Sequence, residues 1–380
     1  MSDPKIVDGV DEGPVEGPVL IVGAGLIGAS IGFALRRAGV EVLLEDASPT
    51  VLQEAIYRGA GKMGEPGRTP SVVVIAVPPD AASGEIARAA ERFPEATITD
   101  TTSVKGLILD EAIEAGADAH RLVGGHPMAG REISGPEAAR ADLFDDRLWI
   151  LTPTGHEGQD HVARVRRLVT TCGAQVLSMD PAEHDAAVAL VSHVPQIVAS
   201  SLAAALVGEP ADRIQIAGTG LSDTTRIAGS DPQLWTQILR ANAGPVSGVL
   251  EGVTRRLQQI LDALTPDERA SARHGGLIDR DQVAPVTEVL DHGRQGHARI
   301  PGKHGATSIR YAIVLVMVED KPGELARLFV AAGDLGVNLE DVRIEHVLGR
   351  PSGLVDLFVR PDVSEILAAG LTQAGFDVRA

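Results

Sequence analysis

Three polar residues in the first half of the chain have the types and positions that proton transfer requires. His126 lies in the segment GGHPMAG at residues 124–130, directly after an apolar run. Ser103 follows an earlier apolar run, and Glu132 comes six residues after His126. A neutral imidazole accepts a proton from a hydroxyl while hydride leaves the same carbon. We therefore expect Ser103 and His126 to meet at one edge of a sheet, with Glu132 folded back to orient the imidazole.

Each of these residues also fits a purely structural role. A histidine before a proline is often a turn residue, and Ser103 is placed to cap a helix that begins at Val104. Glu132 fits a solvated loop. The local sequence alone leaves both interpretations open.

A second group of polar residues lies farther along the chain. Arg226 is flanked by small polar residues in the segment SDTTRI, and Asp223 is close enough to hold it in place. A guanidinium in an otherwise acidic chain suits bidentate recognition of a carboxylate. The alternative for Arg226 is an ordinary salt bridge. His193 lies in the segment VSHVP of an apolar run, and its local sequence is most simply that of a buried core histidine.

A dinucleotide-binding fingerprint precedes all of these residues. The apolar run Val19–Val22 leads directly into GAGLIG, whose glycines have the spacing G-x-G-x-x-G. The first glycine permits a tight turn, the second lets the backbone approach a pyrophosphate, and the third lets the following helix pack on the strand. The N-terminal N–H groups of that helix attract phosphate. The cofactor-binding residues of this turn are Gly23, Gly25, Leu26, Ile27 and Gly28.

Acidic residues at the end of the second strand favour one cofactor. Glu45 and Asp46 lie about 20 residues after Gly25, where a carboxylate accepts hydrogen bonds from a ribose diol and repels a 2′-phosphate. We therefore predict NAD, with Asp46 as the ribose contact, and a flavin is the main alternative. Val77 and Pro78, where the next strand ends, are assigned to the same cofactor site.

Short β-branched apolar runs alternate with helical segments over residues 18–180. Strands that are apolar on both sides are typical of a parallel sheet covered by helices on both faces. We therefore predict a Rossmann-type doubly wound α/β domain over this range. The expected strands are Val19–Val22, Val40–Leu44, Val72–Val77, Thr97–Thr99, Leu122–Gly124, Leu148–Thr152 and Gln175–Ser178.

The rest of the chain divides into two further predicted domains. Residues 181–298 begin with an Ala-, Val- and Leu-rich run and read as an all-helical substrate and dimerisation domain, buried in a large core or between the subunits of a homodimer. Residues 299–308 read as a linker. Residues 309–380 read as strand, helix, strand, strand, helix, strand, the order of a ferredoxin-like βαββαβ domain.

Composition excludes several classes of protein. The net charge is −18 over 380 residues, which opposes non-specific nucleic-acid binding because that requires a basic face. Cys172 is the only cysteine, so no intrachain disulfide can form and a cytoplasmic setting is the simple interpretation. Residues 1–17 read as a disordered tail without the pattern of a secretion signal. No apolar run approaches the ~20 residues that span a bilayer, so no membrane partner is expected.

Several segments occur in the order found in the prephenate dehydrogenase family. They are GAGLIG at 23–28, DTTSVKG at 100–106, GGHPMAG at 124–130 with Glu132, SHVP at 192–195 and DTTR at 223–226. The chain resembles this family of tyrosine biosynthesis over about residues 18–300. The HPMAG element is far more specific than the glycine fingerprint. The segment VEDKPGEL at 318–325 resembles an ACT domain, which some bacterial members carry at this end.

The resemblance implies oxidative decarboxylation of prephenate to 4-hydroxyphenylpyruvate with reduction of NAD, and no metal. By motif, His126 resembles the catalytic histidine that accepts the hydrogen bond from the ring hydroxyl. Ser103 resembles the serine that positions His126 and that hydroxyl. Glu132 resembles a glutamate of the same polar network.

The resemblance also implies residues that bind substrate and effector. Arg226 resembles the residue that binds the ring carboxylate, with Asp223 beside it, and His193 is similar to a second substrate-site histidine. In the ACT-like segment, Gly323 and Asn338 resemble an effector site, and tyrosine is the expected inhibitor. A ferredoxin-like dimerisation module that senses nothing is the alternative for this segment.

Other activities stay open on the sequence. Arogenate dehydrogenase has the same fold and an amino acid side chain in place of the pyruvyl group of its substrate. The motifs do not separate it from a prephenate enzyme, or from a cyclohexadienyl enzyme that accepts both. A regulator that senses NAD and amino acids without catalysis is a more remote alternative.

Overall fold

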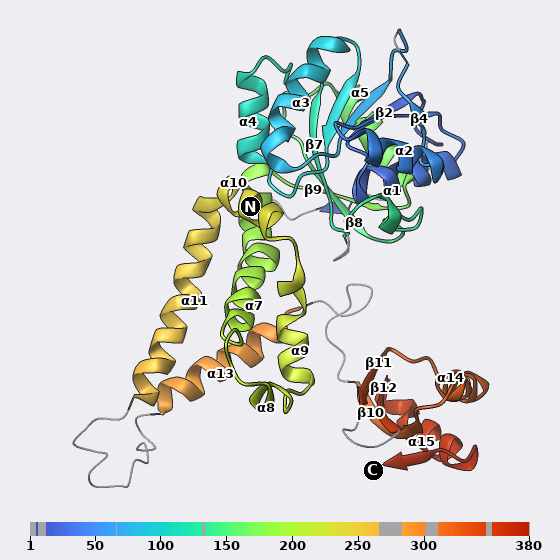
Figure 1. The fold of residues 1–380 in the computed structure, drawn as a ribbon, viewed down its shortest axis with the longest axis vertical. Coiled ribbons are helices and arrows are strands. Elements are labelled where there is room, and N and C mark those ends of the chain that lie inside the picture. Colours follow the sequence, from blue (N-terminus) through green and yellow to red (C-terminus); the bar gives the residue numbers. More distant parts are fainter. Residues whose placement is uncertain are drawn as a thin grey trace. The chain divides into compact units, whose positions relative to one another are not determined.

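The computed structural model describes residues 5–6, 13–65, 67–130, 134–265, 283–300, 311–346 and 352–379 (Figure 1). The chain forms two compact units, residues 1–253 and 254–380. The boundary falls inside helix α11 (Ala243–Leu264), whereas the sequence predicted domain boundaries near residues 180 and 298. The first helices after the sheet therefore belong to the same compact unit as the sheet.

The first unit is built on nine strands. They are β1 (Lys5–Ile6), β2 (Val19–Val22), β3 (Val42–Glu45), β4 (Lys62–Met63), β5 (Val72–Ile75), β6 (Thr97–Asp100), β7 (Leu122–Pro127), β8 (Leu148–Thr152) and β9 (Gln175–Ser178). Their order in the sheet is β1-β9-β8-β7-β6-β5-β2-β3-β4. The six strands from β7 to β4 in that order pair in parallel. The carboxyl ends of β2, β5, β6 and β7 therefore lie at one edge of the sheet.

Helices cover both faces of this sheet. They are α1 (Leu26–Arg37), α2 (Pro49–Tyr57), α3 (Pro79–Arg92), α4 (Gly106–Glu114) and α5 (Gln159–Thr171), with the 3-10 turn η1 (Pro136–Ala138). Val19 and Ile21 of β2 pack in a core with α1, α2 and α5, whereas Leu20 packs in a second core with α3 and α4. Figure 1 shows α3 and α4 on one side of the sheet and α1 and α2 on the other. Two-sided burial explains why these strands are apolar at consecutive positions.

Seven of the nine strands were predicted, and the differences have local causes. The sequence did not predict β1 and β4, which have two residues each and carry no periodic signal. The expected parallel pairing does not extend to β8, which pairs antiparallel with β7. The parallel pairing resumes between β8 and β9.

The segment predicted as a disordered tail is partly ordered. Lys5–Ile6 pairs antiparallel with β9, and the side chain of Val15 is 2% exposed. Residues 1–4 and 7–12 lie outside the described part of the chain.

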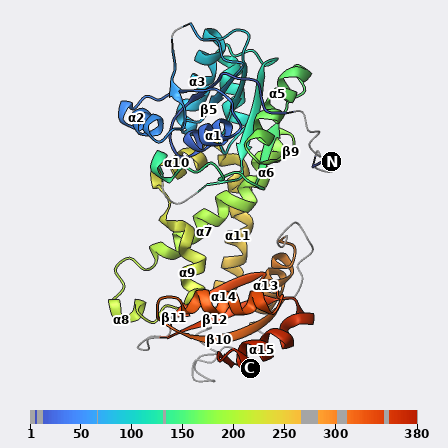
Figure 2. The ribbon, with the colours of Figure 1, turned by 90° about the vertical axis from the view of Figure 1, so that its right-hand side faces the viewer.

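A helical region continues the first unit. Its elements are α6 (Pro181–Val188), the π-helical turn η2 (Ala189–His193), α7 (Val194–Ala204), α8 (Ala211–Ile214), α9 (Thr219–Thr225), the 3-10 turn η3 (Arg226–Gly229), α10 (Pro232–Ala241) and the first half of α11. Ala189, Val194 and Val246 form a small core between η2, α7 and α11. Figure 2 shows α6 and α7 leading away from the sheet.

The continuous helical stretch Pro181–Ala204 is apolar enough to be a candidate membrane span. Among the described residues it alone meets that criterion by length and hydropathy, and 33% of its most apolar window is buried. The expectation that no run reaches this length is therefore wrong. A core helix of a soluble protein meets the same criterion, so the finding is weak evidence for a membrane.

The second unit contains a four-stranded antiparallel sheet. Its elements are α13 (Ala284–His297), β10 (Ala312–Glu319), α14 (Glu324–Asp334), β11 (Asp341–His346), β12 (Ser352–Val359), the 3-10 turn η5 (Pro361–Val363), α15 (Ser364–Gln373) and β13 (Asp377–Arg379). The strand order is β11-β12-β10-β13. Val316, Leu357, Leu328 and Leu371 form the core in which α14 and α15 pack against the sheet. Of the predicted linker 299–308, residues 301–308 lie outside the described part of the chain.

Candidate active site

The turn between β2 and α1 is shaped by glycine. Gly23 has a φ of +98°, and a Cβ there would lie 2.4 Å from the carbonyl oxygen of Ala76. A Cβ on Gly28 would lie 1.8 Å from the carbonyl oxygen of Gly23, so only glycine lets α1 approach the turn this closely. Gly25 differs, because a Cβ there would meet no atom within 4 Å. The backbone of Gly25 therefore borders open space, which a ligand can approach.

The start of α1 is arranged to receive an anion. Gly25 is its N-cap residue, and no side chain in the described part of the chain caps it. The N–H groups of the first turn are thus free of side-chain acceptors, and the helix dipole favours negative charge there. Leu26 and Ile27 are half-buried, and Ile27 packs on the core under the helix. The open turn and the uncapped helix fit the pyrophosphate of a dinucleotide.

The side chain of Asp46 borders this turn, whereas the side chain of Glu45 does not. The Oδ2 atom of Asp46 accepts a hydrogen bond of 2.7 Å from the backbone N–H of Ala24, and its Oδ1 atom accepts one of 2.7 Å from that of Ser48. Glu45 instead forms an ion pair of 2.8 Å with Arg92. Each oxygen of Asp46 keeps the capacity to accept a further hydrogen bond. This geometry supports Asp46 as the residue that contacts a ribose.

Val77 and Pro78 lie across from the turn, after β5. The Cγ1 atom of Val77 is 3.0 Å from the place that a Cβ on Gly23 would take. Pro78 is exposed and is the N-cap residue of α3. Strand order reverses between β2 and β5, and ligands of doubly wound sheets bind in the crevice at that position.

His126 lies on β7 at the same edge of the sheet and is half-buried. Its Nδ1 atom is 2.9 Å from the Nε2 atom of His184, and the two rings meet edge to face. The Nδ1 atom of His184 is in turn 2.8 Å from the Oδ1 atom of Asp185. His184 is fully buried and Asp185 is 7% exposed. Two imidazoles thus form a chain that ends in a buried carboxylate of α6.

Asp185 caps α4 from a distant part of the sequence. Its carboxylate accepts hydrogen bonds of 2.8 Å from the backbone N–H groups of Lys105 and Gly106. The alternative role of Ser103 as the cap of a helix beginning at Val104 is therefore wrong, because α4 begins at Gly106. Burial raises the pKa of Asp185, but the hydrogen bonds from His184 and from the two N–H groups outweigh it, so that pKa lies below its usual value.

A buried ion pair holds the backbone immediately before His126. The ammonium of Lys105 contacts the carboxylate of Asp100 and donates a hydrogen bond of 2.6 Å to the carbonyl oxygen of Gly125. Asp100 accepts a hydrogen bond of 3.1 Å from the N–H of Gly125. Lys105 and Asp100 are both fully buried. Both backbone polar groups of Gly125 are therefore fixed, and with them the position of His126.

The environment of His126 keeps its imidazole neutral. Burial lowers the pKa of His126 well below its usual value, and His184, Lys105 and His193 act in the same direction. Burial also lowers the pKa of Lys105, although Asp100 opposes this effect. A neutral imidazole at pH 7 is the form that accepts a proton.

His193 belongs to the same buried cluster. The amide nitrogen of Asn242 donates a hydrogen bond of 2.8 Å to the carbonyl oxygen of Asp185 and lies 3.0 Å from the Nδ1 atom of His193. Because an amide nitrogen only donates, Nδ1 of His193 accepts and its proton is on Nε2. Burial lowers the pKa of His193 to about 4. Its Nε2 atom is buried without a partner in the described part of the chain, as expected where a ligand or a water completes a site.

Three other residues predicted for catalysis or substrate binding lie in described segments. Asp223, on α9, and Arg226, at the start of η3, are exposed on segments that pack against α7. Ser103 is half-buried in the bend before α4. Glu132 lies outside the described residues, and the described side chain hydrogen-bonded to His126 is that of His184.

The sequence analysis did not single out five residues of the cluster. They are Asp100, Lys105, His184, Asp185 and Asn242. The available signal was the polar triplet Glu183–Asp185 within an apolar helical run, since a buried polar group needs a partner. What the sequence could not supply was the tertiary contact that places Asp185 at the start of α4.

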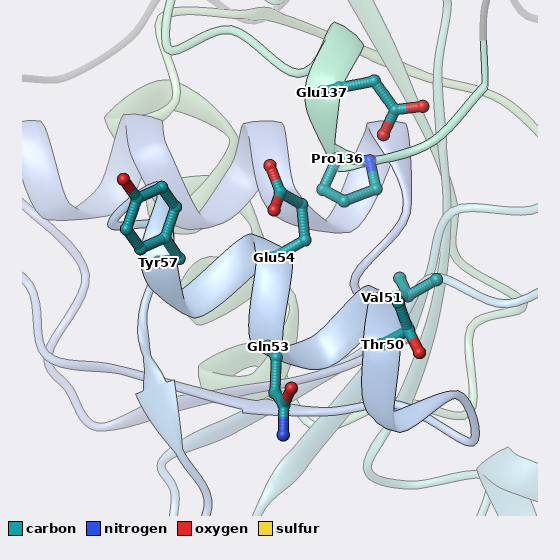
Figure 3. Close-up of a pocket in the computed structure, with 7 residues that line it drawn as sticks. All are labelled: Thr50, Val51, Gln53, Glu54, Tyr57, Pro136 and Glu137. Carbon is teal, nitrogen blue, oxygen red and sulfur yellow. The ribbon is translucent and has the colours of Figure 1, made fainter.

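A pocket lies away from this cluster, between α2 and η1 (Figure 3). It is lined by Thr50, Val51, Gln53, Glu54, Tyr57, Pro136 and Glu137. It contains none of the predicted site residues. Over the described ranges, no group of three or more His, Cys, Asp or Glu side chains is arranged to hold a metal ion.

Comparison with known proteins identifies the family. Residues 31–178 match the prephenate dehydrogenase nucleotide-binding domain, and residues 180–273 match the prephenate dehydrogenase dimerization domain. The apolar helix Pro181–Ala204 therefore lies in a domain that associates with a second subunit in this family.

Individual relatives agree with this match. The chain is 37% identical to the protein named "Probable prephenate dehydrogenase NovF" of Streptomyces niveus, over 92% of this chain and 95% of that protein. The prephenate dehydrogenase of Aquifex aeolicus, solved with hydroxyphenyl propionate and NAD+, superposes with a TM-score of 0.61 at 29% identity, over 73% of this chain and 97% of that one. The arogenate dehydrogenase of Synechocystis superposes with a TM-score of 0.57 at 25% identity, over 73% of this chain and 99% of that one. The chain belongs to the prephenate dehydrogenase family.

Proposed function

We propose that the chain catalyses the NAD-dependent oxidative decarboxylation of prephenate to 4-hydroxyphenylpyruvate. The observation that carries this proposal is the neutral, half-buried His126, held at the carboxyl end of β7 by His184 and Asp185. It lies at the sheet edge where the glycine turn presents the start of α1. A proton acceptor and a dinucleotide site at one edge are the parts that dehydrogenation of a carbinol requires.

The residues around the glycine turn would hold NAD. Gly25 and the first turn of α1 would face the pyrophosphate, Asp46 would accept hydrogen bonds from the ribose, and Val77 and Pro78 would border the cofactor. NAD, when bound, accepts the hydride that leaves C4 of the substrate ring. The carboxylate of Asp46 disfavours a 2′-phosphate by charge repulsion, which supports NAD over NADP.

The reaction needs one proton acceptor from the chain. The Nε2 atom of His126 takes the proton of the C4 hydroxyl as the C4–H bond breaks. The C1–carboxylate bond then breaks, its electron pair makes the ring aromatic, and carbon dioxide leaves. The oxygen at C4 takes the proton back from His126 and becomes the phenol, so the chain ends the cycle unchanged. Aromatisation provides most of the driving force, and the chain need only align the substrate.

We assign the remaining residues to substrate binding. Arg226 binds the ring carboxylate with Asp223 beside it, and His193 donates from Nε2 to a substrate oxygen. Ser103 and Glu132 complete the polar surroundings of the ring hydroxyl. The support is the position of these residues in family motifs and, for His193, a buried N–H without a partner in the described part of the chain.

Purified protein tests the proposal directly. NADH formation is followed with NAD and prephenate, and separately with arogenate, and the keto acid product is identified by mass. We expect rapid NADH formation with prephenate and release of carbon dioxide. The likeness to the Synechocystis enzyme makes arogenate the second candidate substrate. Turnover with arogenate and not with prephenate would identify arogenate as the substrate. Binding of NAD without turnover of either substrate would indicate a regulator.

We also propose that residues 309–380 form an ACT domain that binds tyrosine. The support is the order of strands and helices and the sheet order β11-β12-β10-β13. Gly323 is the N-cap residue of α14 at a φ of +93°, with no atom within 4 Å of a Cβ built there. Asn338 lies in the loop before β11 and donates a hydrogen bond of 3.0 Å to Glu340. Gly323 lies in the loop that joins β10 to α14, and Asn338 lies in the loop that joins α14 to β11.

Calorimetry of the full chain with tyrosine tests the effector site. We expect binding that Asn338→Ala weakens, and inhibition that disappears when residues 308–380 are deleted. Absence of heat with tyrosine, together with loss of the dimer on deletion, would favour a dimerisation module.

We further propose that the protein is a cytoplasmic homodimer with domains at 18–180, 181–298 and 309–380. The match to a dimerization domain supports the homodimer, and the single cysteine supports a cytoplasmic setting.

A further inference from the structure

We propose that Asp185 and His184 are positioning residues that fix His126 in the tautomer with its proton on Nδ1 and a free acceptor on Nε2. The catalytic consequence rests on the proposed function, but the tautomer itself does not. No family match or relative assigns a role to either residue. The inference follows from the direction in which hydrogen bonds can run along the chain from Asp185 to His126.

Asp185 determines which group donates and which accepts in each hydrogen bond of the chain from Asp185 to His126. Its carboxylate accepts backbone N–H groups from Lys105 and Gly106 at 2.8 Å, at the start of α4. A helix start favours the negative form of a carboxyl group, and an ionised carboxylate can only accept hydrogen bonds. The Nδ1 atom of His184, 2.8 Å from Asp185, must therefore carry a proton.

The next contact transmits the direction. A neutral imidazole with its proton on Nδ1 has an unprotonated Nε2. The Nε2 atom of His184 lies 2.9 Å from Nδ1 of His126, so it accepts and His126 donates. A doubly protonated His184 would reverse this bond and place the proton of a neutral His126 on Nε2, so the tautomer of His126 distinguishes the two cases.

The consequence falls on the far nitrogen of His126. With its proton on Nδ1, His126 presents a lone pair on Nε2 to the ring hydroxyl. The opposite tautomer would present an N–H there and could not take a proton. When Nε2 takes the proton, the imidazolium keeps its hydrogen bond to His184, whose own proton still points to Asp185.

Other charged and titratable groups surround this chain. Lys105, the N-cap residue of α4, forms an ion pair with Asp100 of β6, and His193 lies on η2. Burial lowers the pKa of His193 to about 4, so at neutral pH it adds no charge. The neutral amide of Asn242 fixes the carbonyl of Asp185 and the tautomer of His193. The direction of the chain therefore depends on Asp185 alone among these groups.

A ring-nitrogen NMR experiment reads the tautomer without any turnover. The full chain is labelled with ¹⁵N-histidine, and the imidazole signals are assigned with His126→Asn and His184→Gln. We expect His126 and His184 both to be neutral and protonated on Nδ1 at pH 7. A proton on Nε2 of His126, or two protons on His184, would overturn the proposal whether or not prephenate is a substrate.

A matched pair of variants tests the catalytic consequence. Gln and Met have nearly the same volume, but only Gln can accept from His126 through its oxygen and donate to Asp185 through its nitrogen. We expect His184→Gln to keep most of kcat and His184→Met to lose about 10²-fold, the lower range for general-base catalysis. The two variants should have the same KM for prephenate and the same Kd for NAD.

Two further readouts separate positioning from structural damage. Asp180→Asn removes a charge from the exposed N-cap of the same helix and should leave kcat unchanged, because Asn caps helices equally well. The melting temperatures of His184→Gln and His184→Met should agree with each other. Equal kcat in those two variants, with both folded, would contradict the proposal. A wild-type protein inactive with prephenate but with the expected tautomers would contradict only the proposed function.

Discussion

Burial does most to set the chemistry of His126. The imidazole lies on a buried strand, beside two other histidines and a buried lysine, and each of these neighbours makes the protonated form less stable. The hydrogen bond to His184 fixes the orientation of the imidazole of His126 although the ring is neutral. A base that stays neutral and fixed is prepared for proton transfer before the substrate arrives.

The pH dependence of the reaction follows from this burial. The neutral form of His126 is the active one, so kcat/KM is lost as the pH falls through its folded-state pKa. Because that pKa is lowered, the acid-side midpoint should lie below about 6.5, the usual imidazole value. A profile of kcat/KM against pH measures it, with the exposed His156→Asn as a control that leaves it unchanged. A midpoint at or above the usual value would contradict a buried neutral base.

Arg226 tests whether an exposed residue of the helical region takes part in binding. Arg226→Ala should raise the KM for prephenate roughly 10- to 100-fold, because a hydrogen bond to a charged group contributes about 1.5–3 kcal/mol. The control is Arg213→Ala, which removes another exposed arginine, paired with Glu209. Steady-state kinetics with both variants give the answer. Equal KM values in both variants would make Arg226 a structural residue.

At the scale of elements, the glycine turn separates folding from binding. A Cβ on Gly28 collides with the backbone of Gly23, whereas a Cβ on Gly25 meets nothing in the protein. Gly28 is therefore required for packing within the protein, whereas Gly25 is not.

Alanine at each position should therefore fail in a different way. Gly25→Ala should keep the melting temperature and weaken NAD binding about tenfold or more, since it disturbs hydrogen bonds to a charged phosphate. Gly28→Ala should lower the free energy of unfolding by about 1–3 kcal/mol, as overpacking does. Thermal unfolding and NAD titration of both variants decide this. A destabilised Gly25→Ala would show that the space beside Gly25 serves the fold.

The elements also show how far the sequence could predict this structure. Strands such as β2, β8 and β9 were predicted to the residue because β-branched runs bounded by polar residues carry a strong local signal. The reversal of β8 was not predictable, because the 20 residues between β7 and β8 encode no direction in their composition. The site was predictable at His126 and at the glycines, where motif and strand end coincide. His184 and Asp185 were not, because their role depends on a contact 80 residues away in sequence, between Lys105 and Asp185.

At the scale of the whole molecule, the helical region carries exposed apolar side chains that a monomer would leave in water. Leu190 and Val191 on η2 are 61% and 64% exposed, and Val198 and Leu202 on α7 are partly exposed as well. They lie in the range that matches a dimerization domain. Burial of such side chains between subunits is the simple way to stabilise this helix.

A charge in this apolar surface should weaken the dimer. Leu190→Arg should shift the protein toward monomer in sedimentation at low micromolar concentration, because burying an unpaired charge is costly. Tyr57→Arg, on α2, replaces a side chain that is 87% exposed and should leave the oligomeric state unchanged. An unchanged dimer in Leu190→Arg would place the interface elsewhere.

The most direct test of the account is the His126→Asn variant, measured for turnover and for cofactor binding together. Asn keeps a polar side chain at the end of β7 but cannot accept a proton at neutral pH. The account predicts a fall in kcat with prephenate of about 10²–10⁴-fold, with the Kd for NAD and the melting temperature unchanged. Turnover close to that of the wild type, in a folded variant that binds NAD, would contradict it.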